Sequence, residues 1–179
     1  MIRIAVVGNI GSGKSFVAKS FGLPVFNADK EVSLIYKKNK FFFKKLNKKI
    51  PKFIKSFPID KKEILSCILA NNKNLKIITK IIHPIVRKKM NLFIKKNKKK
   101  RAIVLDIPLY LENRLNKKGD IIIYVDAKQN PEQNLITVFL DDHYFISANN
   151  GIIPLISSVI KPTKIIEMDF QESKKETFV

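Results

Sequence analysis

"GNIGSGKS", residues 8–15, directly follows the apolar run "IRIAVV" and directly precedes "FVAKSFG". Its spacing, Gly8-x-x-x-x-Gly13-Lys14-Ser15, is that of the phosphate-binding loop of nucleotide-hydrolysing and phosphoryl-transferring proteins. Glycines allow successive backbone N–H groups to converge on an anion, and a helix that begins near Lys14 adds the positive end of its dipole. A buried strand before the loop and an amphipathic stretch after it are the context that this motif requires. The stretch therefore predicts a nucleoside triphosphate site, but it does not indicate which group receives a phosphate.

Each position of this loop has an expected role. The Lys14 ammonium would reach the β- and γ-phosphates of ATP, and the Ser15 hydroxyl would bind Mg²⁺. An ordinary glycine-rich turn after a strand is the alternative, which the flanking pattern does not favour. The remaining residues that we expect to hold the nucleotide are Asn9, Ile10, Gly11, Ser12 and Gly13.

Length and cysteine content limit the class of protein. The 179 residues suffice for one domain with a sizeable core. The single cysteine, Cys67, excludes an internal disulfide and a cysteine-cluster metal site, and we expect it to be buried within "EILSCILA". No apolar stretch approaches the roughly 20 residues that a membrane-spanning helix needs, and the first apolar run leads into the loop instead of forming a signal peptide. We therefore expect a cytoplasmic protein without a membrane partner.

The formal net charge of +20 raises the possibility of nucleic-acid binding. The basic residues are almost all lysines, with only four arginines, and no recognition motif accompanies them. Solvated lysine-rich faces are therefore favoured over a nucleic-acid site. The charge is also uneven, because residues 120–179 carry a net −4 whereas residues 1–119 carry +24. The composition changes near Lys128, which suggests two segments, residues 1–128 and 129–179.

Strands alternate with helices along the first of these segments, which predicts an α/β fold with a parallel sheet. Ligands of such sheets bind at the carboxyl ends of the strands, where Asp29, Asp106 and Asp126 are expected to lie. The expected elements are strands at 2–7, 24–29, 101–108 and 120–126, and helices at 14–21, at about 30–57 with a break at Pro51, at 58–72 with Asp60 as its cap, and at 74–96 across Pro84.

The order of "GNIGSGKS", "FNADKEV", "IIHPIVRKKM" and "VLDIPLYLEN" resembles the dephospho-coenzyme A kinase family over residues 1 to about 128. The loop alone is generic, whereas the Ala28-Asp29, His83-Pro84 and Ile107-Pro108-Leu109 groups are specific. The resemblance implies a P-loop kinase fold of the nucleoside monophosphate kinase type. It also implies ATP-dependent phosphorylation of the ribose 3′-hydroxyl of dephospho-coenzyme A, a step of coenzyme A biosynthesis.

The resemblance also implies catalytic roles for residues at the sheet edge. Asp29 would orient the attacking hydroxyl and accept its proton. Read from the residues alone, Asp29 is equally a helix N-cap for residues 30–37. Asp106 ends an apolar strand at the place where a carboxylate that supports Mg²⁺ would lie.

Four further residues are expected near the acceptor. His83 and Arg87 stand four positions apart, and therefore on one helical face, where Arg87 would pair with an anionic group of dephospho-coenzyme A. A partly buried histidine that bonds to nearby backbone is the alternative for His83. Pro108 and Leu109 would shape the acceptor pocket, which Glu112 would close, and a packing role is the alternative for these positions.

The sequence departs from the kinase family after "IYVDA". The family continues there with an arginine-bearing lid helix, whereas this chain has no arginine beyond Arg114. "LITVF", a turn at Asp141-Asp142 and "HYFIS" instead predict a β-hairpin, and hence a β-rich C-terminal segment. Residues from about 130 to 170 are similar to a fragment of the S-adenosyl-L-methionine hydroxide adenosyltransferase family.

Two explanations of this join remain open, a fusion of two gene fragments, genuine or artefactual, and a divergent kinase with an unusual ending. An arginine that closes on the transferred phosphoryl group is worth about 10³-fold or more in rate. The alternatives to an active kinase are therefore an ATP-binding remnant and an adenosyl-ligand protein built on residues 130–170. Oligomeric state does not follow from the sequence.

Overall fold

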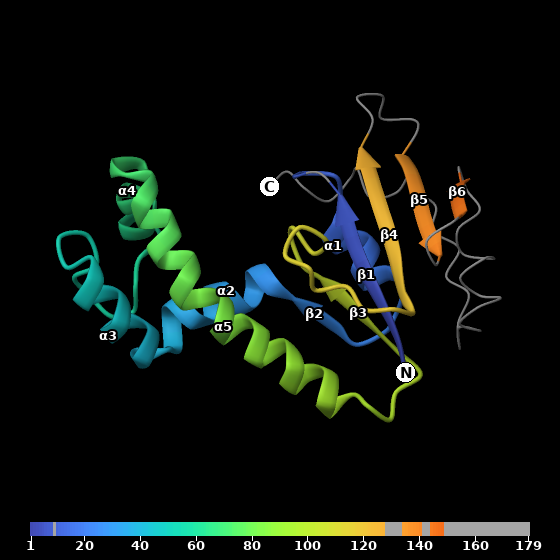
Figure 1. Ribbon diagram of the computed structural model, residues 1–179, viewed down its shortest axis with the longest axis horizontal. Coiled ribbons are helices and arrows are strands. Elements are labelled where there is room, and N and C mark those ends of the chain that lie inside the picture. The colour runs from blue at the N-terminus through green and yellow to red at the C-terminus, as the bar shows by residue number, and fades with distance from the viewer. Residues whose placement is uncertain (9, 128–133, 141–143, 149–179) are drawn as a thin grey trace, which may run out of the picture.

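The fold is built on a six-stranded sheet with the order β2-β3-β1-β4-β5-β6 (Figure 1). This computed structural model describes residues 1–8, 10–127, 134–140 and 144–148, and from residue 126 onward it describes the backbone alone. The strands are β1 (Ile2–Gly8), β2 (Val25–Asn27), β3 (Ala102–Asp106), β4 (Asp120–Ala127), β5 (Asn134–Leu140) and β6 (Tyr144–Ala148).

The first four strands of the sheet order, β2, β3, β1 and β4, run parallel. The register places Asn27 beside Asp106, and Asp106 beside Val6 of the central strand. Apart from Arg3 and Asp106, β1 and β3 are apolar, and they are almost wholly buried, as expected for strands covered on both faces. The predicted α/β fold with a parallel sheet is confirmed, and the carboxyl ends of β1, β2 and β3 meet at one edge.

The last two strands run antiparallel to their neighbours. β5 pairs with β4, and β6 pairs with β5 in a register that sets Leu140 opposite Tyr144. The predicted β-hairpin is therefore confirmed. Its expected turn at Asp141-Asp142 lies outside the described residues, and so does the side chain of Asp126.

Five helices connect and flank the parallel strands in the described part of the chain. Figure 1 shows α3, α4 and the first half of α5 on one side of the sheet, a group that we call the helical lobe. Among the described helices, none combines the length and the apolar character needed to cross a membrane. The helices are α1 (Lys14–Ser20), α2 (Ala28–Lys38), α3 (Lys40–Lys49), α4 (Lys61–Ala70) and α5 (Asn72–Lys96).

Alternation along β1 gives the sheet two apolar faces. Ile4 and Val6 pack with Val17 and Ala18 of α1 on one face. On the other face, residues 5 and 7 pack with Met90 of α5. The sheet is therefore covered by α1 and by the C-terminal half of α5.

The helical lobe has a core of its own. Phe42 and Leu46 of α3, Cys67 of α4 and Ile78 and Ile82 of α5 are buried together. Cys67 is fully buried, as predicted. α5 thus joins the two parts, because its beginning belongs to the lobe and its end covers the sheet.

Side chains fix the ends of these helices much as the sequence predicts. Asp60 accepts a 2.9 Å hydrogen bond from the backbone N–H of Lys62 and caps α4. The helical region expected at about 30–57 is instead two helices that meet at Asn39. The second ends at Lys49, and the part expected beyond Pro51 is wrong, because residues 51–57 are not helical. α5 continues across Pro84, as predicted.

Candidate functional site

The phosphate-binding loop leaves β1 at a position that has no room for a side chain. Gly8 has φ 143°, and a Cβ atom there would lie 2.1 Å from the carbonyl oxygen of Val125 in β4. Gly13, with φ 83°, precedes the first residue of α1. Glycine is required at position 8 by the close approach to β4, and it is favoured at position 13 by the left-handed conformation at the start of the helix. The loop is therefore held against the central strands while its backbone turns toward the helix.

Within this loop the hydroxyl of Ser12 is buried, and it has no hydrogen-bond partner among the described residues. A buried polar group without a partner is costly in a folded protein unless a ligand satisfies it. Ile10 is fully exposed, Lys14 is half-buried and Ser15 is exposed. Asn9, another expected phosphate ligand, lies outside the described residues. The unpartnered Ser12 hydroxyl fits a loop that is completed by a bound anion.

Ser15, Asn27 and Asp106 come together at the sheet edge beside the loop. The Ser15 hydroxyl donates a hydrogen bond of 2.7 Å to Asp106 Oδ2, and the Asn27 amide donates one of 2.5 Å to the same oxygen. Asn27 Nδ2 also lies 3.4 Å from Ser15 Oγ. Asp106 is 4% exposed, so this cluster is anchored by a buried carboxylate.

The direction of the Ser15–Asp106 bond suits a divalent cation. Because Ser15 gives its hydrogen to the carboxylate, the lone pairs of its oxygen point away from Asp106. Hydroxyl and carboxylate oxygens are the ligands that Mg²⁺ prefers, usually together with phosphate and water. The donor set therefore fits the Mg²⁺ site predicted at Ser15, with Asp106 directly behind it.

Asp29 lies one residue inside α2, at the same edge, and is exposed. The cap of this helix is Asn27, whose Oδ1 accepts a 2.7 Å hydrogen bond from the backbone N–H of Lys30. The interpretation of Asp29 as an N-cap is therefore wrong. The cap falls two residues earlier because β2 ends at Asn27 and the helix begins at Ala28. The Asp29 carboxylate in the first turn still gains from the positive end of the helix dipole.

A pocket of about 400 Å³ opens onto the Ser15, Asn27 and Asp106 cluster. An ion pair of 2.8 Å between Glu31 Oε2 and Lys89 Nζ joins α2 to α5 at its wall. The pocket lining thus combines three lysines and one glutamate with apolar side chains. Its lining residues are Ser15, Lys19, Val25, Phe26, Asn27, Lys30, Glu31, Lys89, Leu92, Phe93 and Asp106.

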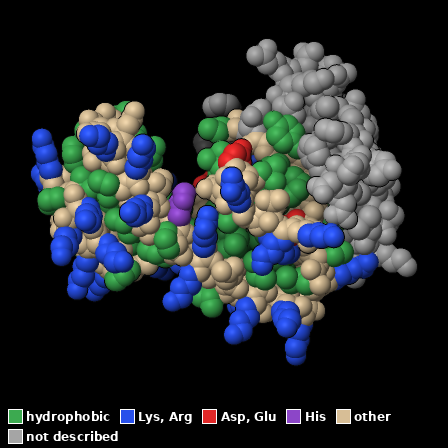
Figure 2. All heavy atoms as spheres, viewed as in Figure 1, with side chains coloured by type: hydrophobic (Ala, Val, Ile, Leu, Met, Phe, Trp, Pro, Cys, Tyr) green, Lys and Arg blue, Asp and Glu red, His purple; other side chains and the backbone are tan. Residues whose placement is uncertain are grey.

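His83 and Arg87 share one face of α5, as predicted, and line a second hollow of about 390 Å³ with Lys76, Thr79, Lys80 and Pro84. Both side chains are exposed. The alternative of a partly buried His83 is therefore wrong, because Ile78 and Ile82 hold the opposite face of the helix in the core. Figure 2 shows lysine and arginine side chains over the helical lobe and the lower part of the molecule, consistent with solvated basic faces.

Arg87 also reaches the loop that contains Pro108 and Leu109. Its Nη2 donates a 3.4 Å hydrogen bond to the backbone carbonyl of Asn113. Pro108, Leu109 and Glu112 are exposed, and Leu109 has φ 55°, a conformation rarely adopted by a leucine. The structure thus links α5 to the loop after β3. Within the described part of the chain, no side-chain hydrogen bond or ion pair joins His83 or Asp29 to Ser15, Asn27 or Asp106.

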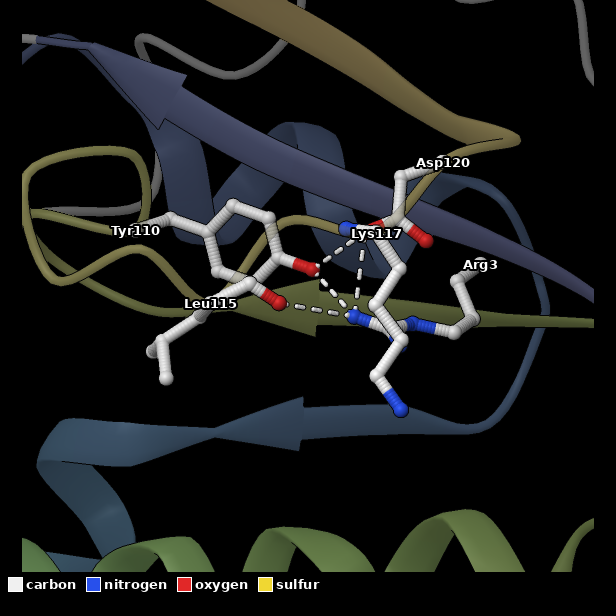
Figure 3. Close-up of polar contacts among 5 residues, drawn as sticks. All are labelled: Arg3, Tyr110, Leu115, Lys117 and Asp120. Atoms are coloured by element: carbon white, nitrogen blue, oxygen red, sulfur yellow. Dashed lines mark hydrogen bonds and ion pairs between the residues drawn. The ribbon is translucent and has the colours of Figure 1, made fainter.

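A buried polar network below this loop was not predicted (Figure 3). Arg3 Nη2 donates to Asp120 Oδ2 at 3.0 Å, to the Tyr110 hydroxyl at 2.5 Å and to the Leu115 carbonyl at 3.1 Å. Asp120 Oδ2 also accepts from the Tyr110 hydroxyl at 2.7 Å and from the Lys117 N–H at 2.8 Å. The loop after β3 is therefore tied to the first residues of β1 and β4.

The sequence contains signals for Arg3, Asp120 and Asn27, which were not among the predicted site residues. Arg3 is a charged residue within the apolar run "IRIAVV", and Asp120 begins the run "DIIIYVD". Charges at the starts of neighbouring buried strands are candidates for a pair. Asn27 stands at the end of its strand, as Asp106 does, and this position was the signal for its place in the site.

Comparison with known proteins now adds to this geometry. The family model for dephospho-CoA kinase matches residues 2–138. The dephospho-CoA kinase of Wolbachia pipientis wMel is 36% identical over 129 residues, which cover 69% of this chain and 66% of that protein. The dephospho-CoA kinase of Bartonella henselae is 33% identical over 129 residues, with the same two shares. The chain thus spans 66% of the length of these curated relatives, just under two thirds.

Two further matches were found. The crystal structure of TT1252 from Thermus thermophilus matches 63% of this chain and 58% of its own chain, with 29% identity and a TM-score of 0.48. The family model for the N-terminal domain of SAM hydroxide adenosyltransferase matches residues 111–179. The predicted resemblances to the dephospho-CoA kinase family and to the SAM hydroxide adenosyltransferase family are both confirmed. The transferase match begins about 20 residues earlier than expected, so it overlaps the end of the kinase match.

Replacement of Tyr110 by Phe tests the network below the loop. Burial and hydrogen bonding to Asp120 raise the pKa of Tyr110 above its ordinary value of 10.0, so the folded protein keeps this proton when the unfolded chain loses it. The stabilisation by Tyr110 is therefore fully present below pH 10 and is lost as the pH rises further. We expect Tyr110→Phe to cost about 1–3 kcal/mol at pH 7, and less above pH 10, in urea unfolding.

Tyr124→Phe is the matched control, because Tyr124 is a half-buried tyrosine of β4 outside this network. A Tyr110→Phe cost that does not exceed the control cost at pH 7 would show that the network does not hold the loop.

Proposed function

Because this chain belongs to the dephospho-CoA kinase family over residues 2–138, we propose that it transfers the γ-phosphoryl group of ATP to the ribose 3′-hydroxyl of dephospho-CoA. The observation that carries this proposal is the hydrogen bond from Ser15 to the buried Asp106, directly beside the phosphate-binding loop. It provides an oxygen-lined position at the sheet edge where nucleotide phosphates and a cation fit together. The proposed reaction is a direct in-line displacement.

In this proposal the loop holds the phosphates of ATP. Backbone N–H groups of residues 10–13 and the dipole of α1 would face the anion, and the Ser12 hydroxyl would donate a hydrogen bond to it. Lys14 begins α1, from where its ammonium reaches the β- and γ-phosphates. Mg²⁺, when bound at Ser15, neutralises charge that develops on the phosphoryl oxygens.

The proposed catalytic residues are Asp29 and Lys14. Asp29 would accept the proton of the attacking 3′-hydroxyl and orient that hydroxyl toward the γ-phosphate. Its exposed carboxylate in the first turn of α2 lies two residues from Asn27, which bonds to Asp106, so α2 brings it to the same edge as the loop. The position of this carboxylate at the sheet edge that carries the loop supports this role.

The proposed acceptor site lies between α5 and the loop after β3. Arg87 and His83 line the hollow of about 390 Å³, whose cationic side chains suit the phosphates of dephospho-CoA. Pro108 and Leu109 would contact the acceptor from the loop, which the Arg87–Asn113 bond holds beside α5. The left-handed conformation of Leu109 projects an exposed apolar side chain, and such strained positions are concentrated at binding sites.

A second candidate function comes from the other family match. Residues 111–179 match the N-terminal domain of SAM hydroxide adenosyltransferase, which supports an adenosyl-ligand site in this part of the chain. Such a site would bind S-adenosylmethionine independently of Lys14. A protein that binds ATP without transferring its phosphoryl group is the remaining alternative, because no arginine follows Arg114 in the chain.

Asp29→Asn tests the catalytic proposal. The amide keeps the size of the side chain but neither carries charge nor accepts the proton, so we expect the rate of 3′-phosphorylation to fall about 10²–10⁴-fold with little change in ATP affinity. The measurement is product formation from ATP and dephospho-CoA by chromatography, with ATP affinity from calorimetry. Asp60→Asn, which changes a distant helix cap in the same way, is the control. Equal rates in Asp29→Asn and the parent protein would remove Asp29 from the mechanism.

We also propose that residues 1–128 form the kinase domain and that residues 129–179 are an atypical added segment. β5 and β6 extend the sheet only beyond β4. Asn27 and Asp106 lie instead at the ends of β2 and β3, and the phosphate-binding loop follows β1. A chain that ends at Lys128 should therefore stay folded in circular dichroism and bind ATP within about twofold of the full chain. Unfolding of this shorter chain would show that the C-terminal segment is an integral part of the domain.

A further inference from the structure

We propose that Asn27 is a positioning residue of the nucleotide site, one that holds the Asp106 carboxylate, and through it the Ser15 hydroxyl, in place for the cation. This inference rests on the proposed function, because it assigns Asn27 to the same site. Asn27 Nδ2 donates to Asp106 Oδ2 at 2.5 Å, and Ser15 Oγ donates to that oxygen at 2.7 Å. Two donors thus converge on one carboxylate oxygen and fix its direction.

Asn27 also joins this cluster to the helix that carries Asp29. While its amide nitrogen donates to Asp106, its Oδ1 accepts the 2.7 Å bond from the Lys30 N–H at the start of α2. A carboxamide is suited to this place because it donates and accepts at the same time. One side chain therefore sets the position of the carboxylate behind Ser15 relative to the first turn of α2.

The other helix caps show that capping alone does not explain these contacts. Asn39 accepts from the Phe42 N–H, and Asn71 accepts from the Lys73 N–H. Asn27 makes the same kind of bond and, in addition, bonds to a buried carboxylate 79 residues away in the sequence. It also lines the pocket of about 400 Å³ beside Ser15 and Asp106, where a ligand has access to the cluster.

Loss of the Asn27 amide would leave Asp106 and Ser15 bonded to each other but free to turn together. The Ser15 oxygen would then present its lone pairs in several directions, and Ser15 would hold Mg²⁺ less well. The backbone loop and Lys14 would still bind the phosphates. Asn27 therefore affects the contribution of Mg²⁺ to ATP binding more than ATP binding without the metal.

Asn27→Ser separates these roles, because serine caps helices about as well as asparagine, yet is too short to cap α2 and reach Asp106 together. Calorimetry of the full chain gives the ratio of ATP affinity in Mg²⁺ to ATP affinity in EDTA. We expect this ratio to fall about tenfold in Asn27→Ser, together with a lower melting temperature, because the buried Asp106 carboxylate loses one of its two donors. Asn71→Ser, a matched change at the cap of α5, should leave both values as in the parent. An unchanged ratio in Asn27→Ser overturns the proposal.

A measurement without nucleotide separates failure of this inference from failure of the proposed function. Side-chain amide resonances of Asn27 are identified in ¹H–¹⁵N spectra by their loss in Asn27→Ser. We expect them to shift when Asp106 is changed to Asn, whereas those of Asn71 stay in place. Asn27 resonances that do not respond to Asp106→Asn contradict the inference, even if the parent binds ATP. A parent protein that does not bind ATP, but shows the shift, contradicts the proposed function alone.

Discussion

The hydrogen bond from Ser15 to Asp106 is the contact on which the site depends. It joins the first turn of α1 to the end of β3, which are 91 residues apart in sequence, across the carboxyl edge of the sheet. The parallel register brings β1, β2 and β3 to the same edge, and the side-chain-free approach of Gly8 to Val125 sets the loop directly above it. A change in strand order would therefore separate the hydroxyl from the carboxylate.

A second set of buried contacts holds the loop after β3. The Arg3, Tyr110 and Asp120 network lies at the starts of β1 and β4, and it holds the loop that carries Leu109. A buried ion pair of this kind is weak evidence for net stability, but removal of one partner leaves a costly unpaired charge. Its main consequence is positional, since it ties the loop that carries Leu109 to the starts of β1 and β4.

Local patterns were sufficient to predict much of this fold. The strand at 2–7, the loop that follows it and the apolar strand ending at Asp106 were predicted because each is a short run with a distinctive boundary. The alternative interpretation of Asp29 as the cap of α2 is wrong, because Asn27 is an equally good cap and the tertiary pairing of β2 with β3 decides where the strand ends. Long-range partners such as Arg3 with Tyr110 were not predictable, since 107 residues separate them and no local pattern records the pairing.

We propose that the loop of residues 8–15 holds the phosphates of ATP through its backbone and Lys14, and this claim depends neither on the basic surface nor on the C-terminal hairpin. Titration calorimetry with Mg²⁺ and ATP, on the parent chain and on Lys14→Ala, tests this claim most directly, with Lys61→Ala as a control for the loss of an exposed lysine at a helix start. The account predicts that Lys14→Ala weakens ATP binding about 10- to 100-fold, the effect of a lost hydrogen bond to a charged group, and that Lys61→Ala does not. Parent-like affinity in Lys14→Ala would contradict the account.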